Sequence, residues 1–311
     1  MRNISVEEIV PLLDADDNVL GDKNYFFNNV QPSETINEQS LDWINPLKKN
    51  KSEYLIKSKA KIVICDSSLE INEDLTKNKC IIVVENPKLT FLRIVNKFFS
   101  EEIKYQVHPS AIVHPEARLA QNCYIGPFTY VGNSEIGEGS IIHGNCHIYD
   151  NVTIGKNVII KAGTTIGSDG FGYQRNKQGV FEKFPHIGGV IIKDNVEIGS
   201  NTSIDRGALG YTIIEEGVKI DNLVHISHNV KVGKHSAIIA NTVIGGSTIV
   251  GEYAWVSPSV SILDQLKIGK KVTIGVGAVV TKNIPDNETW TGSPAVPFHD
   301  YLVLTRKLNK L

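Results

Sequence analysis

From about residue 112 onward, aliphatic residues recur at every sixth position of the chain. The longest unbroken series runs from Ile214 to Val280, and a second runs from Ile136 to Ile166. An amphipathic helix requires apolar spacings of three and four, and a half-buried strand requires a spacing of two. A sustained period of six fits neither pattern. It is typical of a hexapeptide repeat, in which each unit is a short strand followed by a corner.

Three such units close one triangular coil of 18 residues. The aliphatic side chain of each unit points into a narrow core, while Gly, Asn or Asp takes the turn at the corner. Stacked coils pair their backbone amides with the coils above and below, so stability accumulates between nearest neighbours. We therefore predict a mainly β fold with a parallel β-helix over residues 106–290, and we assign its Ile and Val ladders to core packing.

The two ends of the chain lack this period. Residues 1–105 alternate short apolar runs, such as AKIVICD at 60–66 and CIIVVENP at 80–87, with helical patterns in VEEIVPLLD and PKLTFLRIVNKFFSEE. This alternation predicts a small α/β domain. Residues 291–311 have room for a short C-terminal helix.

The composition argues against several classes of function. The formal charge is −2, so no basic excess supports a nucleic-acid partner. No apolar run approaches the roughly 18 residues of a membrane span, and acidic residues interrupt the N-terminus, so we expect a cytoplasmic protein. The four cysteines form no Cys-x-x-Cys pair, so we expect neither a disulfide framework nor a metal site.

Two interruptions of the period are the candidate functional loops. The first lies between Ile166 and Ile192 and reads GSDGFGYQRNKQGVFEKFPHIGGV; the second lies between Ile204 and Ile214, where the phase slips across DRGALGYT. Long loops on a rigid scaffold commonly build binding sites. We therefore expect the loop 168–190 to contribute to function, rather than only to cover an edge of the helix.

His228 occupies a predicted corner, two residues after the core position Ile226, and Gly246 lies two residues after Ile244. Because His228 and Gly246 are 18 residues apart, they should lie side by side on neighbouring coils, with the glycine backbone exposed. A histidine side chain titrates near neutral pH and can take a proton from an attacking nucleophile. A backbone N–H beside it can stabilise the oxyanion that forms. The pair therefore predicts acyl transfer.

Three sequence neighbours, Asp221, His225 and Asn229, are near enough to orient or supplement the His228 imidazole. Two other functions compete with acyl transfer. His225, His228 and His235 suggest the ligands of a zinc hydrase of the γ-carbonic-anhydrase kind, although they fall within about half a coil and should point in different directions. A catalytically inert β-helical scaffold is the other alternative, and it predicts that replacing His228 changes stability alone.

Four segments resemble the UDP-3-O-acylglucosamine N-acyltransferases of lipid A synthesis: GSDGFGY at 167–173, VEIGSNTSIDRGALG at 196–210, VKIDNLVHISHNV at 218–230 and IGGSTIVG at 244–251. The similarity covers most of residues 1–300, because SLDWINP and VVENPKLTFLRIV also resemble the family's N-terminal region. It implies a trimeric left-handed β-helix with an N-terminal nucleotide-recognition domain. The family's catalytic histidine falls on His228, and its oxyanion-binding glycine falls on Gly246.

Several positions depart from the family. A family histidine near the acyl-donor channel is Gln265 here, and two family glutamines are His186 and His225. In the family, two aromatic residues hold the uracil. This sequence has no aromatic pair at the same spacing; the matching region contains Trp43 and Asn45. By resemblance, the N-terminal domain grips the base of a sugar nucleotide, with Trp43 either stacking on that base or serving as a core residue.

We therefore expect an N-acyltransferase that moves an acyl group, by resemblance a 3-hydroxyacyl group, from a pantetheine thioester to the amine of a nucleotide-linked amino sugar. The product would serve lipid A or O-antigen and surface-glycan synthesis. The segment 269–297 resembles the ending of related sugar acetyltransferases, so a short-chain, acyl-CoA-dependent dTDP-amino-dideoxysugar N-acyltransferase is the alternative. No cofactor is covalently bound, because acyl carrier protein or coenzyme A delivers the thioester. The donor lies in a groove between the subunits of a homotrimer.

The resemblance and the loop positions together give two sets of binding residues. Those expected to bind the acceptor are Trp43, Asn45, Asp169, Phe171, Tyr173, His186, Asp205, Asn222 and His225. Those expected to bind the acyl donor are Gln265, Gly275 and Gly277.

Overall fold

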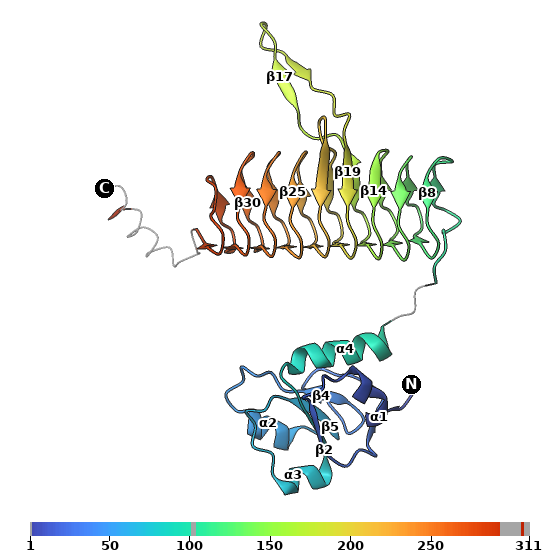
Figure 1. Ribbon diagram of the computed structural model, residues 1–311, viewed down its shortest axis with the longest axis vertical. Helices are drawn as coiled ribbons and strands as arrows, with labels where there is room; N and C mark the ends of the chain where they lie inside the picture. Colours follow the sequence, from blue (N-terminus) through green and yellow to red (C-terminus); the bar gives the residue numbers. More distant parts are fainter. Residues whose placement is uncertain (1, 101–103, 293–305, 308–311) are drawn as a thin grey trace. The chain divides into compact units, whose positions relative to one another are not determined.

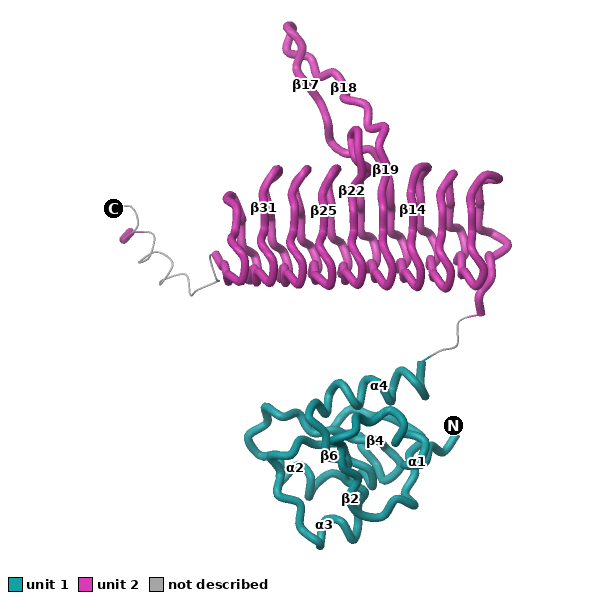
Figure 2. Tube along the Cα trace, viewed as in Figure 1, with its two compact units in different colours: residues 1–102 teal, residues 103–311 magenta. Residues whose placement is uncertain are grey.

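The computed structural model describes residues 2–100, 104–292 and 306–307, and the chain divides into two compact units, residues 1–102 and 103–311 (Figure 2). The predicted C-terminal helix over 291–311 lies almost wholly outside the described residues. Each unit has its own hydrophobic core.

The N-terminal unit is a four-stranded sheet packed with helices. The strand order is β2 (Asn18–Gly21), β6 (Cys80–Val83), β5 (Ile62–Cys65) and β4 (Leu41–Trp43). The helices are α1 (Val6–Ile9), α2 (Lys51–Lys57), α3 (Glu73–Asn78) and α4 (Pro87–Phe99), with a 3₁₀ turn at Val10–Leu12 and a small pair of strands, β1 (Ile4–Ser5) and β3 (Phe26–Phe27). Strands β4, β5 and β6 are parallel, and β5 is buried along its whole length, as expected of a strand covered on both faces.

The second unit is a parallel β-helix of three sheets, which confirms the predicted left-handed hexapeptide-repeat fold (Figure 1). The first sheet contains β7 (Ile112–Val113), β10 (Tyr130–Val131), β13 (His147–Ile148), β16 (Thr165–Ser168), β21 (Ser203–Asp205), β24 (His225–Ile226), β27 (Val243–Ile244), β30 (Ser261–Ile262) and β33 (Val279–Val280). The second contains β8 (Arg118–Leu119), β11 (Glu135–Ile136), β14 (Val152–Ile154), β19 (Gly189–Ile192), β22 (Tyr211–Ile214), β25 (Lys231–Val232), β28 (Ile249–Val250) and β31 (Lys267–Ile268). The third contains β9 (Tyr124–Ile125), β12 (Ile141–Ile142), β15 (Ile159–Ile160), β20 (Glu197–Ile198), β23 (Lys219–Ile220), β26 (Ala237–Ile238), β29 (Trp255–Val256), β32 (Thr273–Ile274) and β34 (Thr289–Trp290).

The six-residue ladder forms the core of this helix. The second residue of most strands is a buried Ile or Val, and these side chains form one continuous cluster. Burying an aliphatic side chain of this size contributes roughly 1.5–3 kcal/mol each. Many corners are turned by asparagine with positive φ, from Asn122 to Asn287, because Asn tolerates the left-handed conformation better than most residues.

The two phase interruptions leave the helix at one corner, between the first and second sheets. The longer one carries an antiparallel hairpin, β17 (Tyr173–Arg175) and β18 (Phe181–Lys183), which projects from the coils (Figure 1). The interruptions bond to each other through their backbones: Ile187 N donates to Ala208 O at 2.9 Å, and Gly188 N donates to Gly207 O at 3.0 Å. The two loops therefore form one layer over this corner.

Candidate active site

His228 lies at the corner that follows β24, beneath the layer formed by the two loops. Strand pairing places Ile226 beside Ile244, so Gly246 is the neighbour of His228 on the next coil. A Cβ atom built on Gly246 would come within 2.7 Å of His228 Nε2. The structure thus brings together the two residues expected to be catalytic, and only glycine leaves this space free.

The neighbouring Asn229 determines which nitrogen of His228 carries the proton. Asn229 Oδ1 accepts a hydrogen bond from the Ala208 N–H at 2.9 Å, so this atom is an acceptor. His228 Nδ1 lies 3.1 Å from the same oxygen and therefore donates its proton to it. The lone pair of neutral His228 is then on Nε2, the nitrogen that faces Gly246.

The Gly246 N–H is available to a ligand, because no hydrogen bond from it occurs within the described ranges. The carbonyl of Gly246 is bound by Gln265 N at 2.8 Å, and the next amide, Ser247 N, donates to His228 O at 2.9 Å. These bonds fix the Gly246–Ser247 peptide, which directly follows the Gly246 N–H. The residues that carry this free base and this free backbone N–H therefore lie side by side and border the same space.

That space is a pocket of about 280 Å³, lined by Phe171, Asp205, His225, Ser227, His228, Gly246, Ser247, Asp264 and Gln265. Its volume is near the lower end of the roughly 300–1,000 Å³ of small-molecule sites. It therefore suits one ring of a larger ligand better than the entire ligand.

Asp205, at the end of β21, provides a carboxylate in this pocket and is only 5% exposed. Its Oδ1 accepts a hydrogen bond from Ser168 Oγ at 3.1 Å, and its Oδ2 lies 3.6 Å from His225 Nε2. Burial raises the pKa of Asp205, and the imidazoles of His225, His228 and His186 and the hydroxyl of Ser168 oppose that rise.

His186 is buried directly beside His228. The two rings meet edge to face with centroids 5.2 Å apart. His186 Nδ1 lies 3.1 Å from the Phe184 carbonyl oxygen, which only accepts, so Nδ1 is the protonated nitrogen. Its Nε2 is buried without a hydrogen-bond partner in the part of the chain that the structure describes. A Cβ atom on Gly170 would lie 3.0 Å from this Nε2, so the loop backbone closes tightly over both imidazoles.

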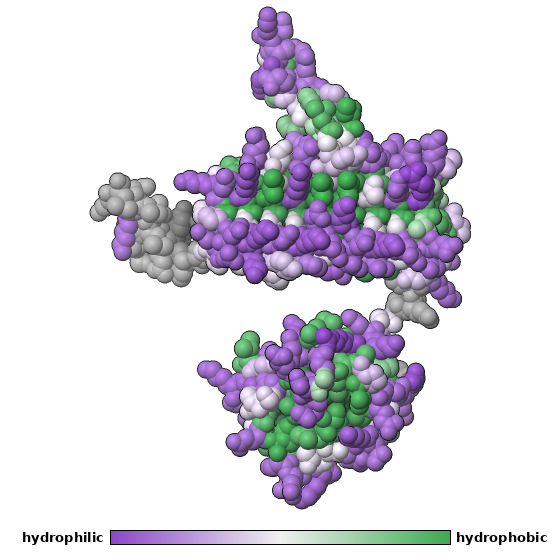
Figure 3. Space-filling model, viewed as in Figure 1, coloured by the Kyte–Doolittle hydropathy of each residue, from purple (hydrophilic) through white to green (hydrophobic). Residues whose placement is uncertain are grey.

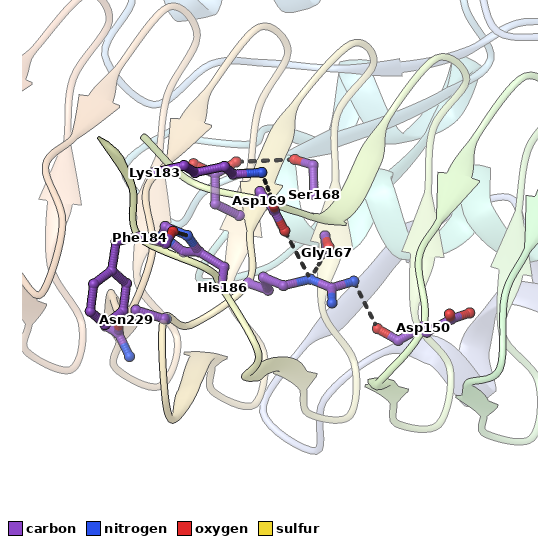
Figure 4. A network of polar contacts seen from close by, with 11 residues as sticks. Asp150, Gly167, Ser168, Asp169, Lys183, Phe184, His186 and Asn229 are labelled. Atoms are coloured by element: carbon purple, nitrogen blue, oxygen red, sulfur yellow. Dashed lines mark hydrogen bonds and ion pairs between the residues drawn. The ribbon is translucent and has the colours of Figure 1, made fainter. Parts of the chain in front are cut away.

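Ionic contacts at the base of the hairpin fix the loop (Figure 4). Asp169 pairs with Lys183 at 2.5 Å and lies 4.0 Å from Arg206, and the hydrogen bond from Lys183 is the main cause that lowers the pKa of Asp169. Arg206 Nε donates to Gly167 O at 2.6 Å, and Nη2 donates to Asp150 O at 3.2 Å. Asp169 is therefore an anchor of the loop in this structure.

Apolar side chains gather at the base of the hairpin (Figure 3). Phe171, 83% exposed, contacts Tyr173 with ring centroids 4.9 Å apart, and Phe184, Ile187 and Leu209 are also exposed. Of these aromatic rings, Phe171 alone lines the pocket around His228.

Other predicted residues lie elsewhere. Asn222 is at the corner between the third and first sheets, where its Oδ1 accepts from Ser200 N at 2.7 Å. Gly275 and Gly277 are at the same kind of corner, after β32, whereas Gln265 lines the pocket itself. Asp221, expected near His228, instead accepts a hydrogen bond from Ala240 N at 3.3 Å, so that expectation is wrong.

In the N-terminal unit, Trp43 and Asn45 have structural partners. The Trp43 ring is half-buried in the core beside Phe91, with ring centroids 6.0 Å apart, and Asn45 Oδ1 accepts from Leu47 N at 3.0 Å. A nearby pocket of about 360 Å³ is instead lined by residues that include Asp42, Tyr54, Lys57 and Lys59.

The zinc-hydrase ligand set is not assembled. His235 lies at the corner between the second and third sheets and stacks on Tyr253 at 5.3 Å, whereas His225 and His228 line the pocket at another corner. Among residues 2–100, 104–292 and 306–307, no cluster of three or more His, Cys, Asp or Glu has metal-binding geometry, and no helix has the length and hydropathy of a membrane span.

Ser168, Gly170 and Asp264 also belong to the site, and the sequence analysis missed them as site residues. Ser168 bonds Asp205, Gly170 packs on the two imidazoles, and Asp264 lines the pocket and accepts from Gln265 Nε2 at 2.9 Å. Of these three, only Asp264 could have been found from the sequence. It lies 18 residues after Gly246, so the period places it beside Gly246 on the next coil.

Comparison with known proteins agrees with this architecture. Residues 133–168 match the family described as bacterial transferase hexapeptide (six repeats). The UDP-3-O-acylglucosamine N-acyltransferase of Methylobacterium nodulans is 45% identical over 148 residues, which are 48% of this chain and 42% of that protein. The protein of the same name from Herminiimonas arsenicoxydans is 36% identical over 233 residues, which are 68% of this chain and 66% of that protein. The chain thus spans less than half of the first relative and 66% of the second.

Solved structures share the fold. A Francisella novicida UDP-N-acetylglucosamine acyltransferase matches with a TM-score of 0.54 and 27% identity, over 64% of this chain and 73% of that chain. An Arabidopsis UDP-N-acetylglucosamine acyltransferase, at a TM-score of 0.51 and 22% identity over 60% of this chain and 71% of that chain, indicates a common fold alone.

Proposed function

This chain is a hexapeptide-repeat protein homologous to the UDP-3-O-acylglucosamine N-acyltransferases, and from that premise we propose that it transfers an acyl group to an amine. The donor is a pantetheine thioester, and the acceptor is a nucleotide-linked amino sugar. One observation carries the proposal: the bare Nε2 of His228 lies beside Gly246, whose N–H is unbonded within the described residues, and both residues line one pocket. No nucleophilic Ser or Cys is needed.

His228 acts as the general base. Its Nε2 takes a proton from the amine as the nitrogen attacks the thioester carbon, while Asn229 Oδ1 holds the Nδ1 proton and stabilises the imidazolium. The Gly246 N–H stabilises the oxyanion of the tetrahedral intermediate. When that intermediate collapses, the C–S bond breaks and His228 returns the proton to the leaving thiolate. The amide and the free thiol remain.

The acceptor enters with its amino-sugar ring in the pocket, and the size of the pocket supports this assignment. We assign recognition of the nucleotide to the N-terminal unit. The packing of the half-buried Trp43 against Phe91 favours its role as a core residue, so the pocket beside Tyr54 is the better candidate for the base. UDP-3-O-acylglucosamine is the first acceptor to test, because the curated relatives carry its name.

The donor is carried by acyl carrier protein or coenzyme A. Gln265 is near enough to touch the thioester end, whereas Gly275 and Gly277 would contact the pantetheine arm further along the helix. The location in the cytoplasm stays a prediction.

A homotrimer is part of the proposal. Three large apolar residues, Phe128, Leu223 and Val276, are 56–72% exposed and all lie at corners between the third and first sheets. Phe128 and Leu223 also have φ near +60°, a conformation that costs a bulky residue energy. Exposed apolar residues along one edge are typical of a surface that is covered by another protein, and in a homo-oligomer this partner is a second copy.

The test is an acylation assay read by mass spectrometry. The acceptors are UDP-3-O-acylglucosamine and several dTDP- or UDP-amino-dideoxysugars, each offered with hydroxyacyl carrier protein or short acyl-CoAs. His228→Ala should lower turnover by about 10²–10⁴, the usual worth of a general base. His235→Asn is the matched control, because His235 is an exposed corner residue with positive φ away from the pocket. Absence of any product that depends on His228 would overturn the proposal.

A further inference from the structure

The pocket contains a second acid–base pair that the reaction described above does not use. Asp205 is 5% exposed, yet among the residues that the structure describes its carboxylate accepts one hydrogen bond, from the neutral Ser168 Oγ, and otherwise lies beside the pocket and His225. His225, whose side chain is 42% exposed, connects this buried carboxylate to solvent. A buried carboxylate with so few partners is costly and calls for a cationic ligand.

The number of protons that the reaction releases explains why a second pair, Asp205 and His225, would be needed. A hydroxyl acceptor loses one proton, and the leaving thiolate takes one up, so one base is sufficient. An amine flanked by electron-withdrawing groups has a pKa of roughly 8, like an α-amino group, and arrives mainly as an ammonium near pH 7. Forming its amide releases one proton more than the thiolate takes up. That proton needs a second acceptor and a route out of the pocket.

Resting on the proposed function, we propose that Asp205 binds the acceptor's ammonium group and removes its first proton, and that His225 passes this proton to solvent. The ammonium N–H bond breaks as the Asp205 O–H bond forms. Asp205 then gives the proton to His225 Nε2, and His225 releases the proton on Nδ1 to water. The free amine attacks the thioester with His228 as its base. Asp205 is then ionised again, and His225, left with its proton on Nε2, regains its starting tautomer by exchanging protons with water.

The geometry permits these steps. The 3.6 Å between Asp205 Oδ2 and His225 Nε2 is longer than a hydrogen bond, so a small ring rotation or one bridging water completes the route. Contacts of this kind often shorten once substrate is bound. The raised pKa of Asp205 makes it a stronger base than an exposed carboxylate.

The other charged or titratable groups near Asp205 have partners or positions that exclude them from receiving the ammonium proton. His186 Nδ1 is held by the Phe184 carbonyl, and its Nε2, which lies under Gly170, belongs to a residue that does not line the pocket. Arg206 turns away to Gly167 O and Asp150 O. Asp169 is paired with Lys183. Asp264 lines the pocket but accepts from the Gln265 amide. His228 is reserved for the attacking amine, which leaves Asp205 and His225 for the ammonium proton.

The test measures kcat/KM against pH for the full chain and for Asp205→Asn, with the amine acceptor and thioester that give product. Without the carboxylate, only free amine reacts. The ratio of wild-type to variant kcat/KM should therefore be about tenfold larger at pH 7 than at pH 9, given an ammonium pKa of roughly 8. Ser168→Ala is the matched control, since it removes one hydrogen bond to Asp205 and keeps the carboxylate. Its kcat/KM should retain the wild-type dependence on pH.

Two further measurements test the proposal, and the first keeps it falsifiable even if Asp205→Asn folds poorly. His225→Gln, at a half-exposed position, should lower kcat/KM severalfold more at pH 7 than at pH 9. In a His228→Ala background, Asp205→Asn should weaken acceptor binding at pH 7, measured by calorimetry, with little change at pH 9. Equal losses at both pH values, or no loss, would overturn the proton route and leave the acyltransferase proposal intact. Failure of the wild-type chain to acylate any amine would overturn both.

Discussion

At the scale of the residue, Gly246 matters because it has no side chain. A Cβ atom there would lie 2.7 Å from His228 Nε2, so any other residue must push the imidazole out of place or block its lone pair. The coil itself tolerates a side chain at a corner, as Ser247 beside it shows. The requirement for glycine is therefore imposed by the neighbouring imidazole of His228 rather than by the fold.

Gly246→Ala should lower kcat by about 10²–10⁴, the usual worth of a general base, because the added Cβ displaces the His228 imidazole while the backbone N–H remains. The far-ultraviolet circular dichroism spectrum should not change, because the displaced group is a side chain. Gly292→Ala is the matched control, since a Cβ there meets nothing within 4 Å. Equal turnover in the two variants would contradict the role of Gly246.

Asp205 also has a measurable effect on stability. Burial raises its folded-state pKa, so ionising it costs more in the folded protein than in the unfolded chain. The penalty is absent below the unfolded pKa of about 3.9 and is fully present above the raised folded value. Asp205→Asn should therefore raise Tm at pH 7, and this gain should shrink as pH falls toward 4 in thermal melts. A lower Tm at pH 7 would contradict the direction of the shift.

At the scale of the element, the long loop is held by a few polar contacts while the coils below it are held by the ladder. Arg206 contributes two of these contacts, to the carbonyl oxygens of Gly167 and Asp150, and lies close to Asp169 (Figure 4). The loop covers both His186 and His228 through Gly170. Its position should therefore control access to the pocket without affecting the coils.

Arg206→Gln should speed amide hydrogen exchange over residues 167–189 and lower kcat/KM by about tenfold, since misplacing a positioned group by about 1 Å can cost up to 10²-fold. Exchange in the coil strands should stay slow. Arg175→Gln is the control, because Arg175 sits in the hairpin and bonds Gly179 O at 2.6 Å within it. Unchanged exchange in the loop would contradict the anchoring role of Arg206.

The six-residue period predicts which residues lie in the aliphatic ladders of the core. It predicts little about the loops that interrupt the coils. Ile226 and Ile244 pair as their spacing requires, and the same register places Gly246 beside His228. By contrast, the contact of Ser168 with Asp205 depends on a register shift where β16 pairs with β21, so the six-residue spacing does not reveal it. Asp221 lies at the corner before β24 and His228 at the corner after it, because the seven positions from Asp221 to His228 carry the chain across one whole side of the coil.

The N-terminal unit illustrates another limit. The helix Pro87–Phe99 and the strands at 62–65 and 80–83 follow from apolar pattern alone, and all three are observed. The environment of Trp43 does not follow from that pattern, because an aromatic residue at the end of a strand can stack on a ligand or on its own core. Here it packs against Phe91.

At the scale of the whole molecule, the proposed assembly is a homotrimer built on the exposed apolar corners. Since one chain has a mass of 34.3 kDa, three chains have a mass of 3 × 34.3, or 102.9, kDa. Light scattering coupled to size-exclusion chromatography should return this value. Leu223→Asn should shift the mass toward one chain, because Asn suits the positive φ while removing the apolar contact. A wild-type mass of one chain would contradict the trimer.

The measurement that tests the central claim most directly is the site of acylation on the product. Wild-type protein, His228→Ala and His235→Asn are each incubated with UDP-3-O-acylglucosamine and a hydroxyacyl carrier protein, and the product is fragmented by tandem mass spectrometry. We predict an amide on the sugar nitrogen from the wild-type protein and from His235→Asn, and at least a hundredfold less of it from His228→Ala. Equal amounts of amide from the wild-type protein and His228→Ala would contradict the claim that this corner of the β-helix carries out acyl transfer.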